Sequence, residues 1–167
     1  MRRLIWLFIF QLLVGCVAMP VKVYHPLPKT SELFISEIKI YKDTEVTTKG
    51  IKNIGVPADD DPYYQEVIKE YSDALKAELL KGGFIVVEEA TPQCLILKTK
   101  IGDNPPPLGG WLGAMAMGIV MIQVEVIQND NVLLYFEEGA NTTLGYKAKK
   151  QAVRLVPRIV KKLKEHL

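Results

Sequence analysis

The sequence predicts an α+β fold, a two-layer sandwich in which two helices pack on one face of a mixed, mostly antiparallel sheet. Segments 62–81 and 146–167 carry apolar residues at helical spacing. Shorter segments before and between them alternate apolar and polar residues or are rich in β-branched residues, which is typical of strands. The order is strand, strand, helix, two strands, a hairpin and a final helix, and it favours a single α/β domain over residues 33–167.

The chain begins with a basic pair, Arg2 and Arg3, followed by a short apolar run from Leu4 to Val14 and then Gly15. This order is typical of a secretory signal peptide over residues 1–15. The run is too short for a membrane span, which needs roughly 20 apolar residues. Processing takes two of the 21 basic residues and none of the 19 acidic ones, so the mature chain is neutral. A neutral chain gives no general case for nucleic-acid binding.

Residues 16–32 predict an extended tether, because closely spaced prolines keep a segment out of helices and central strands: Pro20, Pro26 and Pro28. His25 lies on this tether, and we expect it to be solvated. A half-buried strand is predicted over 33–41 from its alternating apolar residues. The polar segment 43–49 then predicts a turn, and 51–56 a second short strand that ends at Pro57.

A helix is predicted from Pro62 to about Lys81, behind the aspartate triplet 59–61. Aspartate can accept from the free amides of a first helical turn, and proline at the first position gives up only an unneeded donor. Gly82 and Gly83 end the helix, since glycine takes the left-handed cap at little cost. Three consecutive aspartates could also form a calcium-binding site. The ligand spacing of a known calcium loop is absent, however, which favours the capping role.

Further strands are expected on both sides of a proline-rich loop at 102–107, and their ranges are 84–89, 94–101, 120–126 and 132–139. The polar run 128–131 between the last two is typical of a hairpin turn. Cys94 falls in an apolar segment, and we expect it to be a small buried residue without a disulfide partner.

The glycine-rich apolar stretch 108–118 has two interpretations. It is either a buried loop leading into the following strand, or an exposed patch that docks on a partner or inserts in a membrane. In the second case Trp111, Met115 and Met117 would be the contacts.

The last segment, 146–167, predicts a helix with one apolar stripe and one basic face, and Pro157 should kink it or divide it in two. The basic face is either a solvated surface or a contact for acidic lipid headgroups or an acidic partner. The candidate contact residues are Lys149, Lys150, Arg154 and Arg158.

The sequence contains no recognisable catalytic triad, catalytic dyad or metal-binding motif. The two histidines, His25 and His166, lie at opposite ends of the mature chain, and a Ser/His/Asp or Cys/His set cannot be assembled around them. Gly109 and Gly110 lack the lysine and hydroxyl residue that a phosphate loop requires. We therefore expect a protein that is not an enzyme and that holds no metal or dissociable cofactor.

The segment Leu13-Val14-Gly15-Cys16 resembles the lipobox of bacterial lipoproteins. The resemblance implies that Cys16 becomes the first residue of the mature protein, carrying diacylglycerol on its thiol and a fatty acyl group on its amine. In relatives kept at the inner membrane the next residue is often aspartate, whereas Val17 follows here. The resemblance thus implies anchoring in the outer membrane, facing the periplasm.

Residues 33–165 also resemble a family of uncharacterised envelope lipoproteins, through the segment 109–127, the turn 129–131 and the strand 133–139. More distantly, the order of elements is similar to the amino-terminal domain of TolB, the curli secretion lipoprotein and the lipoprotein activators of penicillin-binding proteins. The chain departs from the family by its Asn-Asp-Asn turn and by the prolines at 105–107. The resemblance implies a non-catalytic module that binds an envelope protein and is compatible with an oligomer. The alternative is a membrane-inserting oligomer or secretion-channel component that uses the stretch 108–122.

Overall fold

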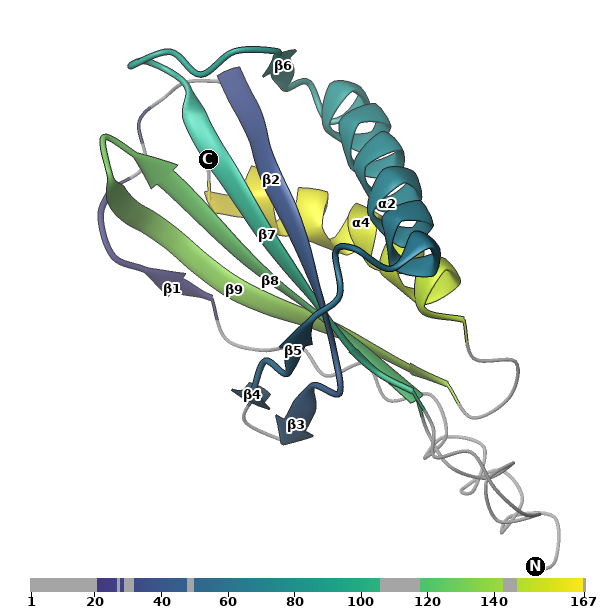
Figure 1. Ribbon diagram of the computed structural model, residues 1–167. Coiled ribbons are helices and arrows are strands. Elements are labelled where there is room, and N and C mark those ends of the chain that lie inside the picture. Colours follow the sequence, from purple (N-terminus) through teal and green to yellow (C-terminus); the bar gives the residue numbers. More distant parts are fainter. Residues whose placement is uncertain are drawn as a thin grey trace, which may run out of the picture.

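The computed structural model describes residues 21–26, 28, 32–47, 50–105, 118–142 and 147–166. A seven-stranded sheet forms one layer, and two helices, α2 (Pro62–Lys81) and α4 (Ala148–His166), form the other. Both helices cover the same face of the sheet, and none of the described residues forms a helix on the opposite face (Figure 1). The predicted α+β sandwich is confirmed.

The sheet is mixed and mostly antiparallel. Its spatial order is β1 (Lys22–Val23), β9 (Asn131–Thr142), β8 (Gly118–Gln128), β7 (Leu95–Asn104), β2 (Glu32–Lys42) and β5 (Val56–Pro57), with β6 (Ile85–Val87) also paired to β2. Strand β2 runs parallel to β7 and β6, and the other pairs are antiparallel. The hairpin turn falls at Asn129 and Asp130, whose positive φ angles of 49° and 62° suit residues that tolerate the left-handed region.

Helix α2 begins as the sequence predicts, with the Asp61 side chain accepting a hydrogen bond of 2.9 Å from the Tyr63 amide. Asp59 from the same triplet does not cap the helix. Its carboxylate accepts a hydrogen bond of 2.8 Å from the amide of Ile40 in β2. The apolar stripes of α2 and α4 pack on the sheet and on each other around Tyr71, Leu75 and Phe136. The buried Cys94, without a disulfide, matches the prediction.

The polar segment expected to be only a turn forms a strand, β3 (Glu45–Thr47), which pairs with β4 (Gly50–Asn53) in a separate two-stranded sheet. The strand expected over 51–56 is therefore two short strands, because Gly55, with φ of 90°, turns the chain between β4 and β5. The sequence prediction missed these breaks because β3, β4 and β5 are short and follow one another closely, so their apolar residues do not mark where one strand ends and the next begins.

Two other boundaries differ from the sequence prediction. The loop expected to begin at residue 102 begins later, because Gly102 to Asn104 still pair with β8. Helix α4 is one continuous element through Pro157, so of the two expected outcomes, a kink or a division, the division does not occur. Proline removes one backbone donor, but buried residues on both sides, Leu155 and Ile159 among them, keep both halves packed on the sheet.

The segment expected to be a tether up to residue 32 already contributes to the sheet. Lys22 pairs with Tyr135 and Val23 with Leu134, and Tyr24 donates its amide to the Leu133 carbonyl at 2.9 Å. Such a short edge strand is compatible with the following proline, since prolines are confined to the edges of sheets. The folded unit therefore starts before the boundary expected at Leu33.

Candidate functional site

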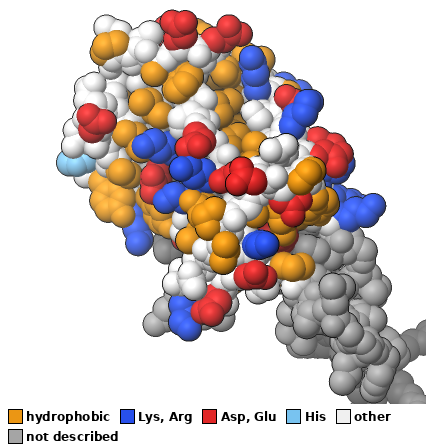
Figure 2. All heavy atoms as spheres, viewed as in Figure 1, with side chains coloured by type: hydrophobic (Ala, Val, Ile, Leu, Met, Phe, Trp, Pro, Cys, Tyr) orange, Lys and Arg blue, Asp and Glu red, His pale blue; other side chains and the backbone are white. Residues whose placement is uncertain are grey.

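The face of the sheet opposite the helices, called here the open face, is lined by two rows of polar side chains. Residues that pair across strands point to the same side of a sheet, so the register defines both rows. The first row is Lys22, Tyr135, Glu125 and Lys98, and the second is Glu137, Gln123, Lys100 and Lys39. Figure 2 shows Lys and Arg side chains gathered near the centre of this face, bordered by acidic groups.

Glu137 is the centre of a hydrogen-bond network in the second row. Its Oε1 atom accepts from Gln123 Nε2 at 2.9 Å and from the Tyr135 hydroxyl, and Gln123 also donates to Tyr135 Oη at 3.1 Å. Burial and the bond to Glu137 together raise the pKa of Tyr135, so this hydroxyl stays protonated and donates. The network fixes the rotamers of three side chains on the open face.

The β3–β4 hairpin folds over one end of the open face and covers this network. The amide of Ile51 donates to Glu137 Oε2 at 3.2 Å, and Glu137 is only 7% exposed. At the base of the hairpin, the Thr44 amide donates to the Asp103 carbonyl at 3.1 Å. Gly102 permits this approach, because a Cβ atom there would lie 2.7 Å from the Thr44 side chain. The hairpin thus closes the open face at Glu137 and leaves Glu125, Lys98 and Lys100 accessible.

Three charged groups on the uncovered part have no hydrogen bond or ion pair through their side chains within the described part of the chain: Glu125, Lys98 and Lys100. Lys39, by contrast, pairs with Glu37 at 3.1 Å. Charges that stabilise a fold are normally paired when they are half-buried, as Glu125 and Lys100 are. These groups are therefore available to a ligand.

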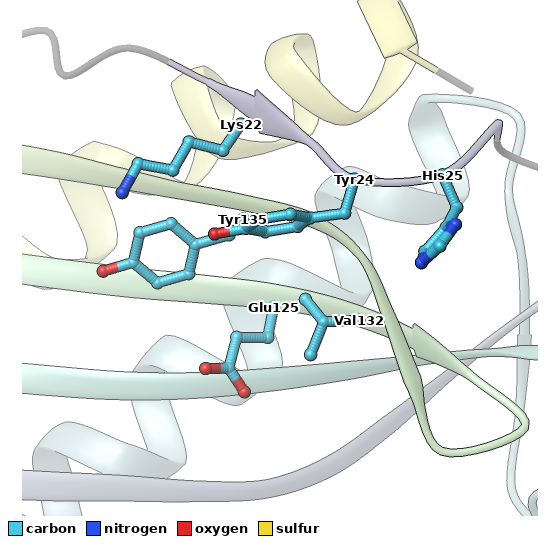
Figure 3. Close-up of a pocket in the computed structure, with 6 residues that line it drawn as sticks. All are labelled: Lys22, Tyr24, His25, Glu125, Val132 and Tyr135. Carbon is cyan, nitrogen blue, oxygen red and sulfur yellow. The ribbon is translucent and has the colours of Figure 1, made fainter.

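Two hollows of about 430 Å³ each lie side by side on the open face, and Glu125 lines both. One is bordered by Lys22, Tyr24, His25 and Tyr135 (Figure 3). The other is bordered by Lys39, Tyr41, Lys98 and Lys100, together with Glu37, whose carboxylate pairs with Lys39. In Figure 3 the Tyr24 side chain extends from the end of β1 over β9 toward Tyr135. Lys22 Nζ lies 5.5 Å from the centroid of the Tyr135 ring, within reach of a cation–π contact.

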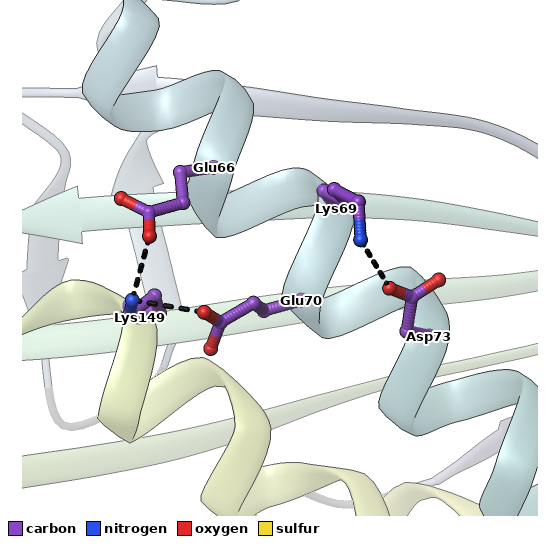
Figure 4. A network of polar contacts seen from close by, with 5 residues as sticks. All are labelled: Glu66, Lys69, Glu70, Asp73 and Lys149. Carbon is purple, nitrogen blue, oxygen red and sulfur yellow. Dashed lines mark hydrogen bonds and ion pairs between the residues drawn. The ribbon is translucent and has the colours of Figure 1, made fainter.

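The predicted basic face of α4 divides into paired and exposed residues. Lys149 bonds Glu66 and Glu70 of α2 at 2.9 Å each (Figure 4), and these hydrogen bonds raise its pKa. Arg158 lies 3.5 Å from the buried Glu138 carboxylate of β9. Lys150 and Arg154 are exposed. Two of the four candidate residues therefore serve contacts within the domain, and only two remain as a free basic surface.

The other predicted site residues are Cys16, Trp111, Met115 and Met117, and all four lie outside the described residues. The lipidation site and both interpretations of the glycine-rich stretch stay predictions. In the described part of the chain, no helix has the length and apolar character that crossing a membrane requires. Those same residues contain no group of three or more His, Cys, Asp or Glu side chains able to hold a metal ion.

The sequence prediction missed the open face as a site. The signal is present in β8 and β9, where polar residues alternate with the buried apolar ones. The hairpin turn at Asn129 and Asp130 alone would set Glu125 opposite Leu134. A register shift between Ile127 and Val126 then brings Tyr135 opposite Glu125 and Glu137 opposite Gln123. The contribution of Lys22 and Tyr24 had no such signal, because the segment before the domain was interpreted as a tether.

A scan with protein-family models finds no match, and a search of curated protein sequences finds none either. Among solved structures, the PelC dodecamer from Paraburkholderia phytofirmans is similar, with 12% identity and a TM-score of 0.48 over 90% of this chain and 95% of that one. A minor lipoprotein from Acinetobacter baumannii has 10% identity and a TM-score of 0.43 over 84% and 91% of the two chains. A PDZ domain protein from Parabacteroides distasonis has 15% identity and a TM-score of 0.45 over 90% of this chain and 36% of its own. At these values the similarities assign neither a family nor a function.

Proposed function

We propose that this chain is a lipid-anchored protein of the bacterial outer membrane, facing the periplasm, and that its domain is a non-catalytic module binding another envelope component. The observation that carries the anchoring is the order of basic pair, short apolar run and Leu-Val-Gly-Cys at residues 13–16. The acyl chains on Cys16 are the only non-protein groups that the proposal requires.

The binding role is supported by the asymmetry of the fold. One face of the sheet is covered by α2 and α4, while the open face keeps unpaired charges and two hollows. A sheet that needed this face only for solubility would not need a buried carboxylate network to hold its side chains in place. The open face is therefore the surface that we assign to the bound component.

The anchoring is tested by labelling cells with a radioactive fatty acid and comparing the natural chain with the Cys16→Ala variant. We expect a labelled, processed natural protein in the outer-membrane fraction and an unlabelled, unprocessed variant. Equal labelling and processing of both proteins would refute lipidation at Cys16.

A membrane-inserting oligomer is the competing function, and it would use residues 108–122. The lipidated protein, extracted in mild detergent, distinguishes the two by its size and by its effect on dye-loaded liposomes. A protein that leaves the liposomes sealed supports the binding module, whereas leakage together with a ring-sized particle supports the oligomer.

A further inference from the structure

The two hollows on the open face adjoin at Glu125, and we treat them together as one groove across the strands. The aromatic hollow spans β1, β9 and β8, the basic hollow spans β8, β7 and β2, and Glu125 of β8 belongs to both. Four interstrand steps separate β1 from β2, so the groove is about 19 Å long at the usual strand spacing. A single small molecule would fill one hollow only, whereas a short oligomeric ligand would fill both.

The two ends of the groove differ in chemistry. At one end Tyr24, which is 54% exposed, offers a ring face, Tyr135 lies beside it with Lys22 Nζ over its ring, and His25 is at the margin. At the other end Lys98 and Lys100 have no acidic partner among the described residues. The exposed ring face suits a flat, weakly polar surface, and the unpaired ammonium groups suit an anion.

The position and lining of the groove argue against two common modes of peptide binding. Extended peptides bind by adding a strand to a sheet edge, but the groove lies on the sheet face, where the backbone groups already bond neighbouring strands. Amphipathic helices need an apolar groove, and this one is lined mainly by charged and phenolic side chains. A ligand in this groove must therefore be recognised by side-chain donors, acceptors and aromatic rings. Sugars make contacts of this kind through their hydroxyl groups, their carboxylates and the apolar faces of their rings.

We propose that the open face binds an acidic oligosaccharide, with a sugar ring stacked on Tyr24 beside Tyr135 and carboxylates paired with Lys98 and Lys100. Glu125, between the two ends, accepts hydrogen bonds from sugar hydroxyls. This inference rests on the proposed function, because it names the chemical class of the envelope component that the domain binds.

The test is calorimetric titration of the full chain in nonionic detergent with a trisaccharide of galacturonic acid, and with the neutral galactose trisaccharide of the same linkage. We expect the acidic sugar to bind at least tenfold more tightly than the neutral one. Lys98→Gln/Lys100→Gln should weaken binding at least tenfold, and Tyr24→Ala at least fivefold. The matched control Lys76→Gln/Lys164→Gln removes the same charge from exposed positions on α2 and α4 and should change the affinity less than twofold.

Several results would overturn the inference: no binding of the acidic sugar, equal affinity of the neutral sugar, or equal loss in the control. Unchanged binding by the Tyr24→Ala variant, or tighter binding of a glutamate tripeptide, would refute recognition of a sugar. Either result would show that the lysines attract anions in general. Failure of the proposed function is seen separately. Loss of fatty-acid labelling refutes anchoring whatever the titration shows, and a labelled, anchored protein without sugar affinity refutes this inference alone.

Discussion

Lys162 Nζ lies 2.6 Å from Glu138 Oε1, where α4 packs on β9, and the Glu138 side chain is only 3% exposed. Arg158 stands 3.5 Å from the other carboxylate oxygen. A buried carboxylate without a cation is costly, so this pair fixes how α4 sits on the sheet.

Replacing Lys162 by Met should destabilise the domain by about 3 kcal/mol, because Glu138 would keep only the longer contact to Arg158. The double variant Glu138→Leu/Lys162→Met should regain most of that loss, because it also removes the buried carboxylate, and Arg158, 38% exposed, can be solvated in its place. Urea denaturation measures both, with Lys164→Met as the exposed control. A single variant as stable as the control would show that the pair does not hold the helix.

Gly50 and Gly83 form a matched pair for the hairpin that covers Glu137. Both have positive φ, of 118° and 90°, but a Cβ at Gly83 meets nothing within 4 Å, whereas one at Gly50 would lie 2.3 Å from Glu137 Oε2. Gly83→Ala should therefore cost about 1 kcal/mol from backbone strain alone, and Gly50→Ala at least about 2 kcal/mol. Equal losses in chemical denaturation would show that the hairpin does not rest on Glu137.

The Tyr64 hydroxyl donates to Asp103 Oδ2 at 2.9 Å, and burial together with this carboxylate raises the tyrosine pKa above its ordinary value of 10.0. The folded pKa thus exceeds the unfolded one, so the stabilisation is complete below pH 10 and is lost as pH rises through the folded pKa. Tyr64→Phe should cost about 1–2 kcal/mol at pH 7, and the gap to the natural protein should narrow above pH 10. A gap that stays constant from pH 7 to pH 11 would contradict this account.

Removal of β1 tests whether the segment before Leu33 belongs to the domain. Without lipid, a chain that starts at Pro20 should be monomeric, whereas one that starts at Lys29 lacks β1 and exposes the edge of β9. We expect the shorter chain to melt at a lower temperature and to self-associate with rising concentration. Identical melting curves and sizes would show that residues 21–25 act only as a tether.

Residues Lys150 and Arg154 test the remaining basic surface of α4. Because the account assigns binding to the open face, Lys150→Gln/Arg154→Gln should leave the affinity of the unlipidated domain for anionic vesicles unchanged at low and high salt. A salt-sensitive loss of about 1 kcal/mol per residue removed would instead assign α4 to the membrane surface.

The sequence was sufficient to predict the elements whose pattern is long and regular. Helix α2, with Asp61 before Pro62, and the stripe of α4 needed no tertiary information. The pairing of β8 with β9 also follows from the hairpin turn between them. The short strands β1, β3 and β4 could not be predicted, because their pairing depends on a partner distant in sequence, such as Tyr135 for Lys22.

The same difference holds for the site. The basic residues of α4 were identified from sequence, but a sequence pattern cannot show that Lys149 faces Glu66 and Glu70 on another helix. The open face combines residues from five strands, and only the register brings Tyr135, Glu125 and Lys98 into one row. Its functional assignment therefore needed the structure.

The most direct test of the central claim, that the open face binds the envelope component, is photocrosslinking in intact cells from single positions on the two faces. The lipidated chain would carry a photoreactive residue at Lys98 or Tyr24 on the open face, or at Arg154 or Lys76 on the helix face. The account predicts adducts of one composition from both open-face positions and none from the helix-face positions, with the Lys98 adduct lost when a ligand-free domain with an intact open face is present in excess. Adducts only from Arg154 or Lys76 would contradict it and would place the binding surface on the helices.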